Sequence, residues 1–162
     1  MKRLIVCSML LLSGCATYQP RAGYNGVVVG SPSTDSTMIQ NPDMINKELV
    51  SALAANIKAG TESNIRKSAN TEVLGQCRDR ALELQGMVVS VSVKVEEKSS
   101  GVFRREHKEI KDYNAVMRGR LVDCKTGKVI DDMALEESDG EVQRIAAAFA
   151  KDLARFVEFQ KQ

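Results

Sequence analysis

The sequence predicts an α+β fold, in which helices pack on a small mixed or antiparallel sheet. Two stretches, residues 87–95 and 113–121, alternate apolar with polar side chains, which is the pattern of strands with one buried face. Two others, residues 45–57 and 142–157, repeat apolar side chains at helical spacing. The expected order is strand, helix, strand, short helix, three-strand meander and helix.

The chain opens on a basic and apolar leader. Lys2 and Arg3 precede an apolar run over residues 4–12. That run is too short to cross a hydrocarbon layer about 30 Å thick, but it has the length of the apolar region of a signal peptide. We therefore expect a cleavable signal rather than a membrane-spanning helix.

Residues 12–15, Leu-Ser-Gly-Cys, follow this leader and resemble the lipobox of bacterial lipoproteins. The resemblance implies cleavage between Gly14 and Cys15, with diacylglycerol and palmitate-type acyl chains carried by Cys15. Ala16 stands where an aspartate would favour inner-membrane retention, so the resemblance implies an outer-membrane anchor facing the periplasm. The alternative is an ordinary secretory signal in which Cys15 is incidental.

Three segments are expected: a signal peptide over residues 1–14, a lipidated tether over 15–25 and a single periplasmic domain over 26–162. Loss of Lys2 and Arg3 reduces the 23 basic residues to 21, equal to the 21 acidic ones. A neutral chain without a clustered excess of positive charge gives no footprint for nucleic acid. The chain has no Trp, three Tyr and four Phe, which argues against a large aromatic pocket for a sugar or a flat cofactor. No small-molecule substrate is therefore evident from the sequence.

The first half of the domain is predicted as follows. Residues 16–41 are rich in Gly, Pro, Ser and Thr and form a tether that contains one short strand, 27–29. A helix starts with Asn41 as N-cap and Pro42 as first residue, and Gly60 ends it. Its apolar stripe is Ile45, Leu49, Leu53 and Ile57. A weak strand over 71–74 and a short helix over 77–84, which ends at Gly86, come next.

The second half contains the antiparallel meander and the last helix. Strands over 87–95 and 113–121 are followed by a turn over 125–128, where Gly127 supplies the positive φ, and by a third strand over 129–135. Residues 138–141, Ser-Asp-Gly-Glu, form a capping box that opens the final helix. That helix is expected to cover the apolar face of the sheet. Its stripe is Val142, Ile145, Ala146, Phe149, Leu153, Phe156 and Val157.

Residues 96–109 form a segment rich in charges of both signs. One interpretation is a protruding hairpin tip that binds a partner, with Phe103, Arg104 and Arg105 as anchors. The other is a solvated loop whose charges keep the protein from aggregating. His107, the only histidine, is interpreted as a surface residue, and without a second histidine or a carboxylate cluster the sequence predicts no catalytic residue, metal or cofactor.

Two cysteines remain after processing, Cys77 and Cys124. Because the periplasm oxidises accessible pairs, we expect a disulfide, although two separately buried thiols are the alternative. The predicted short helix argues against the bridge. Cys124 is expected near the start of the strand from residue 87, and the helix would place Cys77 roughly 10–13 Å back from that point along the helix axis. The Cα atoms of a disulfide lie within about 7 Å of each other.

Residues 84–89, Leu-Gln-Gly-Met-Val-Val, and the hairpin over 119–130, with Leu-Val-Asp followed by Thr-Gly-Lys-Val, resemble TolB N-terminal-like lipoproteins. That group includes the curli secretion subunit CsgG and the penicillin-binding-protein activator LpoB. Pore-forming members carry long apolar hairpins, whereas residues 96–109 are too charged to face lipid.

These observations together predict a membrane-anchored periplasmic lipoprotein that is not an enzyme and that binds an envelope protein as an accessory. The alternative is a structural, self-associating subunit of an oligomeric envelope or secretion assembly.

Overall fold

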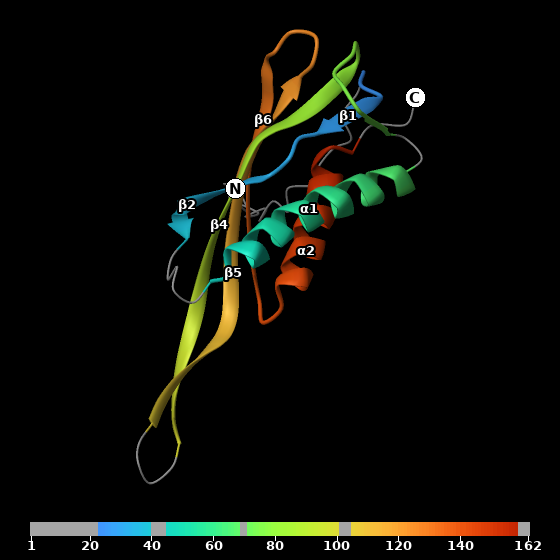
Figure 1. The fold of residues 1–162 in the computed structure, drawn as a ribbon. Helices are drawn as coiled ribbons and strands as arrows, with labels where there is room; N and C mark the ends of the chain where they lie inside the picture. The colour runs from blue at the N-terminus through green and yellow to red at the C-terminus, as the bar shows by residue number, and fades with distance from the viewer. Residues whose placement is uncertain (1–22, 40–44, 69–70, 101–104, 159–162) are drawn as a thin grey trace, which may run out of the picture.

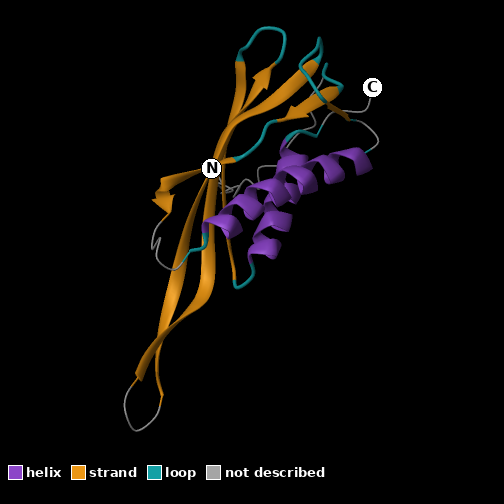
Figure 2. Ribbon diagram, viewed as in Figure 1, coloured by secondary structure: helices purple, strands orange, loops and turns teal. Residues whose placement is uncertain are grey.

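The computed structural model describes residues 23–39, 45–68, 71–100 and 105–158. Two helices pack on one face of a six-stranded sheet, so the predicted α+β class is confirmed (Figures 1 and 2). The strands are β1 (Gly26–Val29), β2 (Ser33–Ile39), β3 (Glu72–Leu74), β4 (Ala81–Ser100), β5 (Arg105–Asp123) and β6 (Val129–Asp139). The helices are α1 (Lys47–Lys67) and α2 (Val142–Phe156). No helix in the described ranges is both long and apolar enough to span a membrane.

The sheet has the order β3-β1-β4-β5-β6, and β2 pairs with β4 beside β1. The predicted meander is confirmed, because β4, β5 and β6 pair antiparallel. The predicted strands over 27–29 and 71–74 also form, and they lie parallel to one another. Gly127 has the expected positive φ, +69°, in the turn between β5 and β6. The alternating residues of the sheet face the helices and are fully buried, as at Val89, Ala115 and Met117.

The short helix predicted over 77–84 is wrong, because β4 begins at Ala81. Leu82 and Leu84 are both fully buried, which is the two-residue alternation of a strand. Gly86 interrupts the register with a φ of +59°, and beyond it the buried side chains are Met87 and Val89. The positive φ expected of a helix cap therefore belongs to a bulge, which moves the buried set from even to odd positions.

The start and the end predicted for the first helix are also corrected. Helix α1 begins at Lys47 with Asn46 as N-cap, whose side chain accepts a bond from the backbone N–H of Glu48 at 2.8 Å. Asn41 and Pro42 lie outside the described residues. Gly60 does not end the helix but lies inside it, where α1 meets α2: a Cβ on Gly60 would lie 2.8 Å from the Cβ of Ala150. Glycine at this position thus allows the two helices to approach closely.

Helix α2 buries the predicted stripe from Val142 to Val157, and the interpretation of its apolar face is confirmed. The predicted capping box is wrong, because Ser138 belongs to β6 and pairs with Asn114. The N-cap is Glu141, and its side chain makes no capping bond. Instead, Asp139 accepts a hydrogen bond from the backbone N–H of Glu141 at 2.9 Å.

Strand β2 was not expected, because its sequence, STDSTMI, lacks apolar alternation. It forms on the edge of β4, where Ser33 pairs with Val88 and Ile39 with Val91. Hydrogen bonding to the neighbouring strand β4 accounts for this strand. The stretch interpreted as tether therefore contains a second strand.

Candidate functional site

A two-stranded ribbon extends from the body of the molecule (Figure 1). It is formed by the ends of β4 and β5, which remain paired from Val93 and Tyr113 to Ser100 and Arg105. Within the described residues, β6 reaches β5 only as far as Tyr113, and β2 reaches β4 only as far as Val91. The outer part of the ribbon therefore has two edges that no other described strand pairs with.

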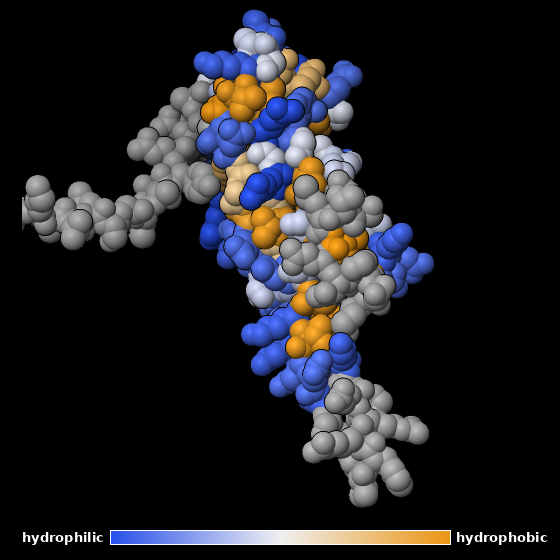
Figure 3. All heavy atoms as spheres, turned by 90° about the vertical axis from the view of Figure 1, so that its left-hand side faces the viewer, coloured by the Kyte–Doolittle hydropathy of each residue, from blue (hydrophilic) through white to orange (hydrophobic). Residues whose placement is uncertain are grey.

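The ribbon face that continues the buried side of the sheet starts apolar and ends charged. Val93 is buried, and Val95 and its partner Ile110 are partly buried. Beyond them Lys108 pairs with Glu97, with nitrogen and oxygen 3.7 Å apart. Figure 3 shows apolar surface reaching the lower part of the molecule, with hydrophilic side chains on both sides of it.

The opposite ribbon face is charged. The ammonium of Lys98 donates to the carboxylate of Glu109 at 2.7 Å, and this hydrogen bond raises the pKa of Lys98. Exposed ion pairs of this kind contribute about 0–1 kcal/mol each. Charged side chains beside open edges also oppose unspecific pairing of strands.

Of the predicted partner-binding residues, the structure describes only Arg105, which lies near the outer end of this ribbon. Arg105 is the first residue of β5 and its backbone pairs with Ser100, while the backbone of His107 pairs with Lys98. Phe103 and Arg104 lie outside the described residues. The described parts of the segment over 96–109, residues 96–100 and 105–109, thus form a strand pair.

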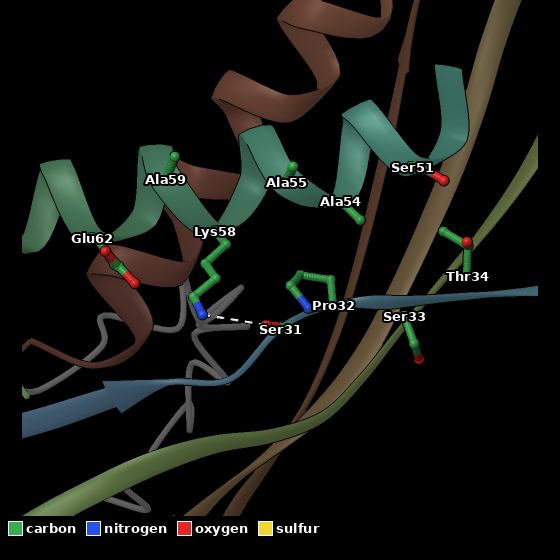
Figure 4. Close-up of a pocket in the computed structure, with 10 residues that line it drawn as sticks. All are labelled: Ser31, Pro32, Ser33, Thr34, Ser51, Ala54, Ala55, Lys58, Ala59 and Glu62. Atoms are coloured by element: carbon green, nitrogen blue, oxygen red, sulfur yellow. Dashed lines mark hydrogen bonds between the residues drawn. The ribbon is translucent and has the colours of Figure 1, made fainter. Parts of the chain in front are cut away.

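A groove of about 530 Å³ lies between α1 and residues 31–34, as Figure 4 shows. The helix contributes one stripe of mostly short side chains to it, and Lys58 spans it to donate to the hydroxyl of Ser31 at 3.2 Å. Glu62 lies one turn further along the same helix. The residues that line the groove from α1 are Ser51, Ala54, Ala55, Lys58, Ala59 and Glu62.

The groove offers hydroxyls, one ammonium and one carboxylate, and its wall is made largely of alanine methyls. Nothing in this set forms a nucleophile with a base. Within the described ranges, no three His, Cys, Asp or Glu side chains gather to hold a metal ion. The groove is thus a surface that could bind a partner or a ligand. Sequence periodicity alone did not identify it, because its other wall is residues 31–34, which are distant from α1 in sequence.

A disulfide joins Cys77 and Cys124, whose Cα atoms lie 5.3 Å apart, so the predicted bridge is confirmed. The geometric objection disappears together with the short helix. A turn before β4, with Arg80 at a φ of +60°, brings Cys77 back beside the strand end. There the backbone N–H of Cys124 donates to Ala81 at 3.0 Å.

Asp123 binds Tyr24, near the first described residue, at the same end of the sheet. Its carboxylate accepts bonds from the backbone N–H of Thr126 at 2.7 Å, the Tyr24 hydroxyl at 2.8 Å and the Thr126 hydroxyl at 2.9 Å. These bonds, the one from the Thr126 backbone first, lower the pKa of Asp123. Gly14 and Cys15 lie outside the described residues.

The comparisons find no protein-family model and no curated protein sequence that matches the chain. Among solved structures, PelC of Paraburkholderia phytofirmans, crystallised as a dodecamer, aligns at 13% identity over 90% of this chain and 95% of its own, with a TM-score of 0.48. A neuraminyllactose-binding hemagglutinin homolog of Helicobacter pylori aligns at 10% identity over 83% and 81%, with a TM-score of 0.47.

A minor lipoprotein of Acinetobacter baumannii aligns at 8% identity over 82% of this chain and 87% of its own, with a TM-score of 0.39. None of these three TM-scores reaches 0.5, so the functions of these proteins do not transfer to this chain.

Proposed function

We propose that the chain is a lipoprotein of the bacterial envelope, attached through lipid on Cys15, that binds another envelope protein with the β4–β5 ribbon and is not an enzyme. The observation that carries the proposal is the ribbon itself, a strand pair that leaves the body of the molecule and whose two outer edges pair with no other described strand.

The lipid anchor is supported by the sequence Leu-Ser-Gly-Cys at residues 12–15 behind a basic, apolar leader. Cleavage before Cys15 would leave a tether over 15–25 and a domain over 26–162, and Ala16 supports the outer membrane, facing the periplasm. The test is metabolic labelling with palmitate, in which Cys15→Ser should abolish labelling and leave the precursor uncleaved. Unchanged labelling would refute the anchor.

The binding role rests on the exposure of the ribbon. An isolated strand pair is marginally stable in water, and its exposed ion pairs add little. Half-buried Val95 and Ile110 lie on it next to the charged pair of Glu97 and Lys108. A partner strand added to an open edge would gain backbone hydrogen bonds, while the apolar and charged side chains would select the partner.

Photo-crosslinking in the native cell tests this role. A photoreactive residue in place of Lys98 or Lys108 should yield an adduct with another envelope protein. The matched control replaces Lys128, an exposed lysine in the turn at the opposite end of β5. The binding role fails if the ribbon positions give no adduct, or if Lys128 gives the same one.

The second candidate is a structural subunit of an oligomeric envelope or secretion assembly. The same open edges favour it, since a second copy could supply the added strand. In that case the adduct from Lys98 would contain only this chain. The mass of the lipid-free chain in solution would then exceed that of a monomer.

A further inference from the structure

A second pocket, of about 260 Å³, lies where the C-terminal ends of α1 and α2 meet. It is separate from the groove and from the ribbon. Lys67 of α1 and Lys151 and Arg155 of α2 line it, with Thr71 beside β3 and with Glu158 after α2. Three cationic side chains from two helices thus surround one pocket that also contains a single carboxylate.

Two of these cations have no acidic partner among the described residues. Lys67 and Lys151 form no ion pair with any residue in the described ranges, whereas Arg155 lies 3.7 Å from Asp152. The charges of the pocket therefore sum to a net positive value.

Helix C-termini oppose an anion, because their free carbonyls carry partial negative charge. Here several are already occupied. The carbonyl of Ile65 accepts from the backbone N–H of Ser68 at 2.9 Å, and that of Leu153 accepts from Val157 at 3.2 Å. The carbonyl of Arg155 accepts from Glu158 at 3.2 Å. These hydrogen bonds reduce the electrostatic repulsion between the helix C-termini and a bound anion.

Thr71 supplies a second, independent observation. The residue is 9% exposed, and its hydroxyl oxygen is buried with no hydrogen-bond partner among the residues that the structure describes. A buried hydroxyl that makes no hydrogen bond destabilises the folded protein. A bound ligand that accepts a hydrogen bond from this hydroxyl would supply the missing partner.

We propose that this pocket binds a phosphate group, held by Lys67, Lys151 and Arg155 and by a hydrogen bond from the hydroxyl of Thr71. A phosphate has enough oxygens to accept from several donors at once, and bonds from cationic donors to such oxygens are the strong kind. A carboxylate, with two oxygens, would satisfy fewer of these donors.

The group could come from a lipid headgroup or from a free phosphate compound. The pocket lies at the end of the sheet where the described chain starts, since the backbone N–H of Glu72 donates to Asn25 at 3.0 Å. From there residues 15–22 span at most about 27 Å. An anchor on Cys15 would therefore keep this end close to the headgroups.

The first test uses inorganic phosphate and the chain from residue 16 onward, which contains all described residues. Calorimetric titration should show binding that the double variant Lys67→Gln with Lys151→Gln weakens at least about tenfold. The matched control is Lys47→Gln, an exposed lysine at the other end of α1, which should bind as the unmodified chain does. Absence of binding, or equal weakening by the control, overturns the proposal.

Thr71→Val separates a ligand role from a structural one. The hydroxyl has no hydrogen-bond partner within residues 23–39, 45–68, 71–100 and 105–158, so its removal should leave the urea midpoint unchanged or raised. Phosphate affinity should nevertheless fall about tenfold. Unchanged phosphate affinity in the folded variant would overturn the proposed role of Thr71.

The second arm identifies the source of the phosphate. The same chain is floated with vesicles of phosphatidylcholine alone or mixed with phosphatidylglycerol. Binding that requires phosphatidylglycerol and is lost in the double lysine variant supports a lipid headgroup. If only inorganic phosphate binds, the source is a free phosphate compound, and if neither binds, there is no phosphate site.

Discussion

The crossing of α1 and α2 at Gly60 gives a prediction that can be worked out quantitatively. In an open helix, Gly60→Ala would stabilise the fold by about 1 kcal/mol, because alanine has the higher helix propensity. Here the new methyl would lie 2.8 Å from the Cβ of Ala150. Overpacking of this kind costs about 1–3 kcal/mol. We expect a net destabilisation of about 1 kcal/mol, the opposite of the usual sign.

Ala150→Gly alone should cost about 2 kcal/mol, from the loss of helix propensity and of one buried methyl. In the double variant the methyl moves from one helix to the other and the clash is removed, so the cost should be close to zero. The two substitutions should therefore couple by about 2–3 kcal/mol. Urea unfolding of the four proteins, with the disulfide oxidised, measures this coupling. Costs that add to within about 0.5 kcal/mol would show that the helices do not meet at Gly60.

Three other predictions concern the core, the pH response and the disulfide. Phe149→Ala should lower the free energy of unfolding by about 3–5 kcal/mol, because this side chain is fully buried. The control Arg144→Ala, at an exposed residue, should lower it by less than about 0.5 kcal/mol. Equal urea midpoints for the two variants would refute this packing. The folded-state pKa of Asp123 is lowered, so its stabilisation is present above the ordinary carboxyl pKa and is lost as pH falls through the folded value. Tyr24→Phe should reduce that acid-side loss, and identical urea midpoints against pH for both proteins would contradict it. Reduction of the disulfide, which spans 47 residues, should lower the free energy of unfolding by about 4 kcal/mol; an unchanged urea midpoint in reductant would argue against a constrained unfolded chain.

The helix boundaries show where local signals misled. Gly60 was interpreted as a helix stop, because glycine is a poor helix former, but contact with α2 more than offsets that cost. The stretch over 81–85, rich in Ala, Leu, Glu and Gln, has helical propensity and nevertheless forms a strand. There the backbone bonds of β1 and β5 on both sides outweigh the local preference.

Local sequence signals were also insufficient to predict the candidate sites. The charged segment over 96–109 was identified from composition, but its form as a strand pair depends on a register set by the remainder of β4 and β5. Neither pocket could be predicted, because each brings together segments that are distant in sequence, such as residues 31–34 with α1. For the second pocket, the sequence shows only that Lys151 and Arg155 lie four residues apart on one helix, and it does not show that Lys67 of α1 lies beside them.

The sequence by itself determined the α+β class, the meander and the buried stripe of α2, and it favoured the bridge between Cys77 and Cys124 over two separate thiols. These follow from periodicity and from cysteine count, which are properties of short windows or of composition. Only the tertiary structure decided the strand identity of residues 81–85, the existence of β2 and the length of α1. Each of these depends on a neighbour distant in the chain, since a backbone hydrogen bond or a helix contact can outweigh a local propensity of about 1 kcal/mol or less.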